Sequence, residues 1–262
     1  MSSDLLVIDE GATRKLVLNR PAKRNAMNNA MLAAMSAELA RAATDDTVRT
    51  IVITGAGDYF CGGRDRQNFD GPTAGKITMG DMSLEANISN FPKVLTQLIE
   101  SPKPTIAAVK GFARAGGQAL MLSCDFVVAE RTCTFGNPEM RFGFPAALNT
   151  VLLARHLGRR KALEIAISGA TYSVAEYDKL GLINSIAEPG TLDAATAEFC
   201  APYNKLAPYA VRRTKDLLRI AEDSDMRQLL FAGDQLNHLL TVNGQLEPLF
   251  NDDAQAAMSK PR

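Results

Sequence analysis

Two glycine-bearing stretches of the chain have the residue types needed to bind a carbonyl oxygen through backbone N–H groups. They are Phe60–Asp65 (Phe-Cys-Gly-Gly-Arg-Asp) and Ala113–Gly117 (Ala-Arg-Ala-Gly-Gly), and each follows an expected strand. Glycine lets the backbone approach a ligand closely. The second stretch opens an expected helix, whose N-terminus stabilises negative charge. Together the stretches could direct one N–H each at a single oxygen, which would form an oxyanion hole. Taken alone, each is more often an ordinary tight link between a strand and a helix.

Glu139 is the acid–base candidate of the sequence. It stands in Phe135–Gly143, a stretch rich in proline, glycine and aromatic residues. A positioned carboxylate can remove and return protons, although an isolated glutamate in such a stretch is more often solvated or ion-paired on a loop. Cys61, beside the first glycine stretch, suggests a nucleophile. Neither His156 nor His238 has a motif that ties it to Cys61, so a packed thiol is favoured and both histidines are expected to be structural or exposed.

The pattern along the first half of the chain alternates strands and helices, which predicts an α/β fold. The β-branched run Thr50–Thr54 reads as a buried strand. Expected strands are 5–9, 15–18, 50–54, 105–109 and 126–129; expected helices are 29–43, 91–100 and 118–124. Asn28 is expected to cap the first helix. From Thr150 the strand signal fades. Helical patterns follow, with a capping box at Ser173 and Glu176, and residues 70–80 read as a mobile loop.

Composition describes an ordinary globular chain of 262 residues, with 46% hydrophobic and 22% charged residues. Lys plus Arg equals Asp plus Glu at 29 each, so net charge favours neither nucleic acid nor an anionic membrane as a partner. No signal peptide or membrane span is expected. The four cysteines show no paired spacing, so a reduced, cytoplasmic location is the simplest interpretation. The chain has two histidines, so the sequence gives little support for a zinc site or a Ser-His-Asp triad.

Four motifs in register resemble the crotonase (enoyl-CoA hydratase/isomerase) superfamily. They are Asn19–Asn28, Phe60–Asp65, Val109–Asp125 and Phe135–Gly143, within a resemblance that covers roughly residues 5 to 190. The resemblance implies a spiral of ββα turns over residues 1–191 with the CoA thioester site. It also implies a helical region, 192–262, that mediates trimerisation, so that the protein would be a homotrimer or a dimer of trimers.

The resemblance also implies roles for individual residues. The backbone N–H groups of Arg64 and Gly116 would form the oxyanion hole, and Glu139 would be catalytic. The backbone of Asn25 and Ala26 would contact the CoA adenine. The residues expected to bind CoA or substrate are Asn25, Ala26, Gly63, Asp65 and Gly117. The substrate would be an acyl-CoA, with no metal and no cofactor beyond the coenzyme A that the substrate carries.

Ala119 is the most informative departure from the family pattern. Hydratases of this family use two glutamates, and the first of them falls at Ala119, which cannot move a proton. A single carboxylate suffices for a 1,3-proton shift, so an enoyl-CoA isomerase is favoured. Hydratase or hydratase–lyase activity and other crotonase chemistry stay open, since some relatives that act on aryl-propenoyl thioesters also lack the first glutamate. A CoA-binding protein without turnover and a nucleic-acid-binding protein are further alternatives, although a pure binder has no need of Glu139.

Other departures concern the acyl group. Arg64 stands where relatives often have a small or apolar residue, and Arg66, Arg114 and Arg141 flank the same motifs. Surface solvation or contacts to CoA phosphates are the simpler explanation, and pairing with a carboxylate on the acyl group is the alternative. Residues 144–149 replace a turn that is often glycine-rich in relatives, which predicts a reshaped acyl pocket.

Overall fold

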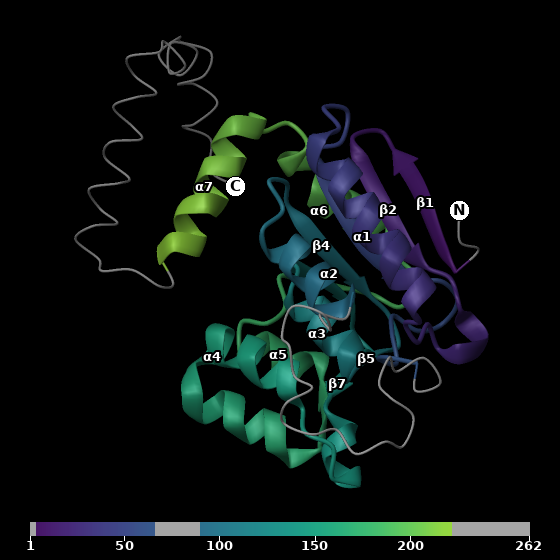
Figure 1. Cartoon of the computed structure of the whole chain (residues 1–262), viewed down its shortest axis with the longest axis vertical. Helices are drawn as coiled ribbons and strands as arrows, with labels where there is room; N and C mark the ends of the chain where they lie inside the picture. The colour runs from purple at the N-terminus through teal and green to yellow at the C-terminus, as the bar shows by residue number, and fades with distance from the viewer. Residues whose placement is uncertain (1–3, 66–89, 222–262) are drawn as a thin grey trace, which may run out of the picture. The chain divides into compact units, whose positions relative to one another are not determined.

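The computed structural model describes residues 4–65 and 90–221 of the chain (Figure 1). Arg66, the loop expected at 70–80 and His238 lie outside these residues. The chain divides into two compact units, Met1–Val211 and Arg212–Arg262. All of the elements that surround the candidate site belong to the first unit.

A six-stranded sheet, ordered β1-β2-β3-β4-β6-β9, forms the centre of the first unit. Its strands are β1 (Leu5–Glu10), β2 (Thr13–Leu18), β3 (Thr50–Gly55), β4 (Thr105–Val109), β6 (Phe126–Glu130) and β9 (Ser185–Ala187). β1 and β2 pair antiparallel, and the remaining pairs are parallel. Every residue of β3 and β4 is buried, as expected for parallel strands covered on both faces. The five strands expected from the sequence are therefore confirmed.

The helices described are α1 (Asn29–Thr44), α2 (Asn90–Ile99), α3 (Gly116–Leu122), α4 (Ala147–Ser168), α5 (Val174–Lys179), α6 (Leu192–Tyr203) and α7 (Pro208–Ala221), with the 3₁₀ helices η1 (Pro21–Lys23) and η4 (Pro138–Phe142). Both predicted caps are confirmed. The Asn28 side chain accepts a hydrogen bond from the Met31 N–H. Ser173 and Glu176 form the reciprocal capping box at the start of α5. Among the described residues, no helix is long and apolar enough to cross a membrane.

A second sheet of three short strands carries part of the site. It has the order β5-β7-β8, with β5 (Phe112–Arg114), β7 (Thr134–Gly136) and β8 (Thr171–Ser173). The sequence pattern was wrong on two points here. The second glycine stretch begins as strand β5 rather than as a turn, and two strands, β8 and β9, follow residue 150. Each of these strands has only three residues, too few to show an alternating pattern.

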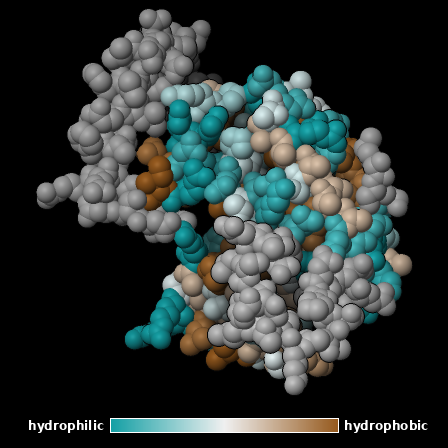
Figure 2. All heavy atoms as spheres, in the orientation of Figure 1, coloured by the Kyte–Doolittle hydropathy of each residue, from teal (hydrophilic) through white to brown (hydrophobic). Residues whose placement is uncertain are grey.

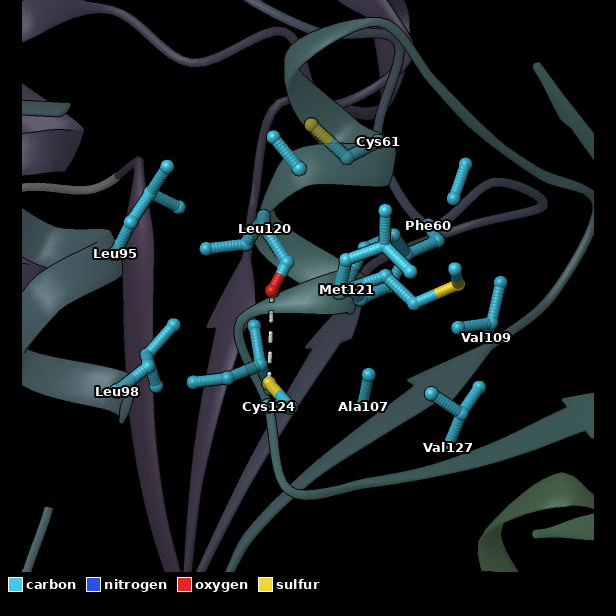
Figure 3. Packing of buried hydrophobic residues seen from close by; sticks show 14 of the residues in the cluster. Phe60, Cys61, Leu95, Leu98, Ala107, Val109, Leu120, Met121, Cys124 and Val127 are labelled. Carbon is cyan, nitrogen blue, oxygen red and sulfur yellow. Dashed lines mark hydrogen bonds between the residues drawn. The ribbon is translucent and has the colours of Figure 1, made fainter. Parts of the chain in front are cut away.

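Helix α3 is the most deeply buried helix of the site. Leu120 and Met121 pack among side chains of α2, β4 and β6, as Figure 3 shows. Helix α6 packs against the sheet through Leu192 and Cys200, in a second cluster that includes residues of β4 and β6. It therefore belongs to the first unit, Met1–Val211. The predicted division into a spiral core over 1–191 and a helical region over 192–262 stays a prediction. The role of residues 192–262 in trimerisation stays a prediction.

Hydrophilic and hydrophobic residues are unevenly spread over the surface. In the view of Figure 2, hydrophilic and hydrophobic residues are mixed over α1, and strongly hydrophobic residues show at the lower left, in the region of α4. Large exposed apolar side chains of η4 and α4 include Phe142, Leu148, Val151, Leu163 and Ile167.

Candidate active site

The two glycine stretches lie side by side and are joined by backbone hydrogen bonds. Cys61 donates to Phe112 O at 3.2 Å, and Arg114 donates to Cys61 O at 3.1 Å. On its other side the first stretch pairs with Met27, whose N–H donates to Gly63 O at 2.8 Å. The first glycine stretch is thus held between the segment before α1 and strand β5.

The N–H groups of Arg64 and Gly116 border a common space. A Cβ built on Gly116 would lie 3.3 Å from Arg64 N, and a Cβ built on Gly63 would lie 3.3 Å from Gly116 N. Gly116 is the first residue of α3, so its N–H has no partner within the helix. The pair that was predicted as an oxyanion hole is therefore brought together around one space. Its role as an oxyanion hole stays a prediction. Gly117 packs against Cys61, because a Cβ there would lie 2.2 Å from Cys61 O.

Ala115 holds the turn that presents Gly116. Its backbone has φ 49° and ψ −122°, a region that residues other than glycine rarely adopt, at a cost of roughly 1–3 kcal/mol. Hydrogen bonds on both sides keep it there. The Ala115 N–H donates to Gly136 O at 3.0 Å, and the Ala115 carbonyl accepts from the N–H of Ala119 at 3.1 Å and from Asn149 Nδ2 at 2.8 Å.

A cavity of about 670 Å³ opens onto this turn. Arg64, Gly116, Ala119 and Glu139 all line it, so the structure places the three predicted chemical residues and the position of the missing glutamate around one space. The rest of the described lining is mostly apolar: Gly62, Phe91, Pro92, Ala115, Pro138, Phe142, Phe144, Pro145, Ala146, Ala147, Leu148 and Asn149.

The surroundings of Glu139 raise the pKa of its carboxyl. It lies in η4, half-buried, and its Oε2 is buried with no hydrogen-bond partner among the described residues. Burial raises the pKa of the carboxyl, and hydrogen bonds from its own backbone and from the Asn149 side chain oppose the rise. A carboxyl of raised pKa facing an apolar cavity is suited to proton transfer near neutral pH.

The residues expected to bind CoA lie beside the cavity rather than in its described lining. The Asn25 side chain is buried and donates to Ala56 O at 2.9 Å and Tyr59 O at 2.6 Å. Asp65 is buried and pairs with Arg20 at 2.8 Å. These side chains stabilise the backbone around the first glycine stretch. Contacts of CoA with the backbone of Asn25, Ala26, Gly63, Asp65 and Gly117 stay predictions.

The flanking arginines have contacts within the chain. Arg64 donates to Asn29 Oδ1 at 2.9 Å and lies over the Phe91 ring, with 5.6 Å from Cζ to the ring centroid. Arg114 lies over the Phe112 ring at 4.7 Å. The stem of Arg141 packs close to Gly169. Each guanidinium or stem therefore has a structural contact of its own.

Cys61 does not have the properties of a nucleophile. Its side chain is fully buried, burial raises the pKa of the thiol to about 12, and Sγ lies 3.2 Å from Asn25 O. His156 contacts Leu122 O at 2.9 Å. The expectation of a packed thiol is confirmed, and His156 has the structural contact that was expected of it.

Asn149 is the polar cavity residue that the sequence did not indicate. It is buried in the first turn of α4, donates to the Ala115 carbonyl and lines the same cavity as Glu139. The sequence marked 144–149 only as a changed segment. A polar residue in the first turn of a helix is a common feature, so no signal in the sequence distinguished it.

Comparison with known proteins agrees with this geometry. The family model for enoyl-CoA hydratase/isomerase matches residues 10–244. The 2,3-dehydroadipyl-CoA hydratase of Escherichia coli is 32% identical in sequence, over 92% of this chain and 91% of the hydratase chain. The enoyl-CoA delta isomerase 2 of Rattus norvegicus is also 32% identical, over 83% of this chain and 55% of the isomerase chain. A crystal structure of an enoyl-CoA hydratase subunit from Geobacillus kaustophilus is 30% identical, with a TM-score of 0.84 over 99% of this chain and 97% of that one.

The family model matches residues 10–244, and the fold agrees with a solved structure over nearly the whole chain, with Arg64, Gly116 and Glu139 around one apolar cavity. This chain belongs to the enoyl-CoA hydratase/isomerase family, of crotonase fold.

Proposed function

We propose that this chain is an enoyl-CoA isomerase that moves a double bond from the 3- to the 2-position of an acyl thioester. One observation carries the proposal: among the described residues that line the cavity, Glu139 is the sole carboxylate, and Ala119 occupies the wall where hydratases of the family have their other glutamate. A single base can move a proton, whereas adding water also requires a group that holds and deprotonates the water.

The proton shift follows from the geometry in two steps. The thioester oxygen accepts hydrogen bonds from the N–H groups of Arg64 and Gly116, which stabilises negative charge on that oxygen. The Glu139 carboxylate then removes a proton from C2, and the electrons of the broken C–H bond form a dienolate. The Glu139 carboxyl returns the same proton to C4, which leaves the double bond between C2 and C3. General acid–base catalysis of this kind contributes about 10²- to 10⁴-fold.

The lining of the cavity favours an apolar acyl group. Phe91, Phe142 and Leu148 supply hydrophobic surface, and the Arg64 guanidinium contacts Asn29 and Phe91. A hydrocarbon chain buried against these walls gains roughly 0.8 kcal/mol per CH₂ group. The coenzyme A moiety arrives as part of the substrate, so the proposal includes no separate cofactor. It also includes a homotrimer or dimer of trimers and a reducing compartment, in which the four cysteines stay free.

Hydration, or hydration followed by C–C cleavage, is the second candidate. The hydratase names of the relatives in Escherichia coli and Geobacillus kaustophilus favour it, although the rat relative is named an isomerase. Turnover by either route separates both candidates from a CoA-binding protein that has lost catalysis.

A product analysis tests the proposal. The purified protein is incubated with matched 2-enoyl- and 3-enoyl-CoA panels in deuterium oxide, and products are identified by mass and by deuterium position. We expect conversion of the 3-enoyl to the 2-enoyl thioester to be faster than hydration of the same chain. Efficient hydration with no isomerisation at any chain length would overturn the single-carboxylate argument.

A further inference from the structure

A buried polar network reaches the cavity from the side opposite to solvent. Tyr177 of α5 donates to Gln118 Oε1 at 2.8 Å, and Gln118 Nε2 faces Asn137 Oδ1 at 3.2 Å and Asn149 Oδ1 at 3.5 Å. Asn149 Nδ2 in turn donates to the Ala115 carbonyl at 2.8 Å. Tyr177, Gln118 and Asn137 have no exposed surface, and Asn149 is 3% exposed. Polar side chains buried to this extent keep one arrangement, because a lost partner is costly.

The network fixes which way the Asn149 amide points. Burial raises the pKa of Tyr177, so its hydroxyl stays protonated and donates to Gln118 Oε1. The Gln118 NH₂ group then faces Asn149, so Asn149 turns its oxygen toward α3 and its NH₂ group toward the cavity turn. An NH₂ group has two N–H bonds. One serves the Ala115 carbonyl. The amide lines the same cavity as Glu139 and lowers the pKa of that carboxyl.

The Ala115 carbonyl and the Gly116 N–H belong to one peptide group. Because a trans peptide is planar, its carbonyl and its N–H point in opposite directions. Holding the Ala115 oxygen therefore aims the Gly116 N–H away from Asn149. Ala115 has the strained φ of 49°, and its carbonyl accepts from two donors, the Ala119 N–H and Asn149 Nδ2. Loss of the Asn149 bond therefore leaves this strained peptide with one of its two anchors and more reason to rotate toward a relaxed conformation.

We propose that Asn149 is a positioning residue whose amide, by holding the Ala115 carbonyl, orients the Gly116 N–H of the oxyanion hole. It acts on the reaction through that N–H. The expected effect of Asn149 on turnover rests on the proposed function, whereas its effect on the orientation of the Gly116 N–H does not.

Few charged side chains lie near Glu139 that could change its pKa. Arg64 faces the cavity from the first glycine stretch, and Arg141 lies on η4 itself with its stem against Gly169. The described cavity residues of α2, α3 and α4 are uncharged. Burial and hydrogen bonding, rather than a neighbouring charge, set the Glu139 pKa.

The variants Asn149→Ala and Asn149→Asp test the proposal, with Asn204→Ala as control. Asn204 also bonds buried side chains, Thr13 and Thr50, but it lies at the end of α6 away from the cavity lining. Asn149→Asp keeps the volume of the side chain, so a loss of packing cannot explain its effect. If Asn149→Ala does not fold, Asn149→Asp carries the test.

Two measurements need no substrate. The Glu139 carboxyl is titrated by ¹³C NMR and assigned by its absence in Glu139→Gln, and the Gly116 amide is followed in ¹⁵N–¹H spectra. We expect both Asn149 variants to shift the Gly116 resonance and the Asn204→Ala control to leave it unchanged. We also expect Glu139 to titrate at higher pH in Asn149→Ala, because the amide lowers the pKa of that carboxyl. An unchanged Gly116 resonance in a folded Asn149 variant would overturn the proposal.

Turnover adds a third measurement. In Asn149→Ala we expect kcat to fall roughly 10- to 100-fold with little change in KM, and the acid limb of the pH profile to move to higher pH. A kcat within 2-fold of the parent would overturn the positioning role. If the parent enzyme itself converts neither 2-enoyl nor 3-enoyl thioesters, the proposed function fails, and the two NMR measurements still decide the role of Asn149.

Discussion

We expect the replacement of Gly116 by alanine to block the proposed oxyanion hole while leaving the fold intact. The new Cβ lies 3.3 Å from Arg64 N, and 3.4 Å from Met27 Cε and from Phe91 Cε1. An oxygen held by the N–H groups of Arg64 and Gly116 needs the same space, about 2.7–3.1 Å from each donor. The methyl group therefore excludes the thioester oxygen from its position without removing either N–H.

The expected magnitudes separate catalysis from stability. Loss of one oxyanion donor costs about 10²- to 10³-fold in kcat, so Gly116→Ala is expected to lose at least that much. Alanine in a helix is about 1 kcal/mol more favourable than glycine, which offsets tight contacts with the movable ends of Met27 and Phe91. We expect the free energy of unfolding to change by less than about 1 kcal/mol. Gly117→Ala is the contrasting variant: its Cβ would lie 2.2 Å from Cys61 O, so it should not fold stably.

Single-turnover isomerisation rates, thermal melts and calorimetric binding of a saturated acyl-CoA measure these effects. Gly116→Ala should melt near the parent temperature and still bind the CoA portion of the ligand, yet turn over at least 100-fold more slowly. If the folded variant keeps kcat within 3-fold of the parent, Gly116 does not contribute to an oxyanion hole and the site must stabilise the enolate by other groups.

Four further predictions concern the base, the missing carboxylate and the assembly. Glu139→Gln should lose roughly 10²- to 10⁴-fold in kcat while it still binds CoA esters; near-parental kcat would exclude Glu139 as the base. Because burial raises the folded-state pKa of Glu139, folding stability falls as pH rises through that pKa, so Glu139→Gln should melt higher than the parent at pH 7 and equally below about pH 4; a constant difference across pH would contradict this. Ala119→Glu, if folded, should raise the ratio of hydrated to isomerised product. Light scattering should give the mass of a trimer or hexamer, and truncation after residue 191 should cause aggregation; an active monomer would contradict the assembly.

The sequence predicted the central sheet because its strands carry the pattern of burial on both faces. Thr50–Thr54 and Thr105–Val109 are short β-branched or apolar runs bounded by glycine or proline, and both are strands in the structure. The sequence pattern did not predict the short strands β5, β7, β8 and β9, because three residues are too few to show an alternation of buried and exposed positions. Their pairing depends on partners distant in sequence, such as Phe135 with Tyr172.

The site was predictable to the extent that backbone chemistry and family motifs determine it. The motifs indicated Arg64, Gly116 and Glu139, and the structure places all three around one cavity. The contribution of Asn149 was not predictable, because it depends on where α4 begins and on the orientation of an amide set by Tyr177 and Gln118. Neither is a local property of the sequence around residue 149.

The burial of Glu139 fits a base that must act twice on the same substrate. A proton shift requires one carboxyl to accept a proton at C2 and to release it at C4, so neither too weak nor too strong a base serves both steps. Burial raises the pKa of Glu139, and the Asn149 hydrogen bond limits the rise. With Ala119 in the same cavity wall, this group has no second described carboxylate to share the proton with. Under the proposed function, an apolar cavity with one described carboxylate would both oppose hydration and favour returning the proton to the substrate rather than losing it to solvent.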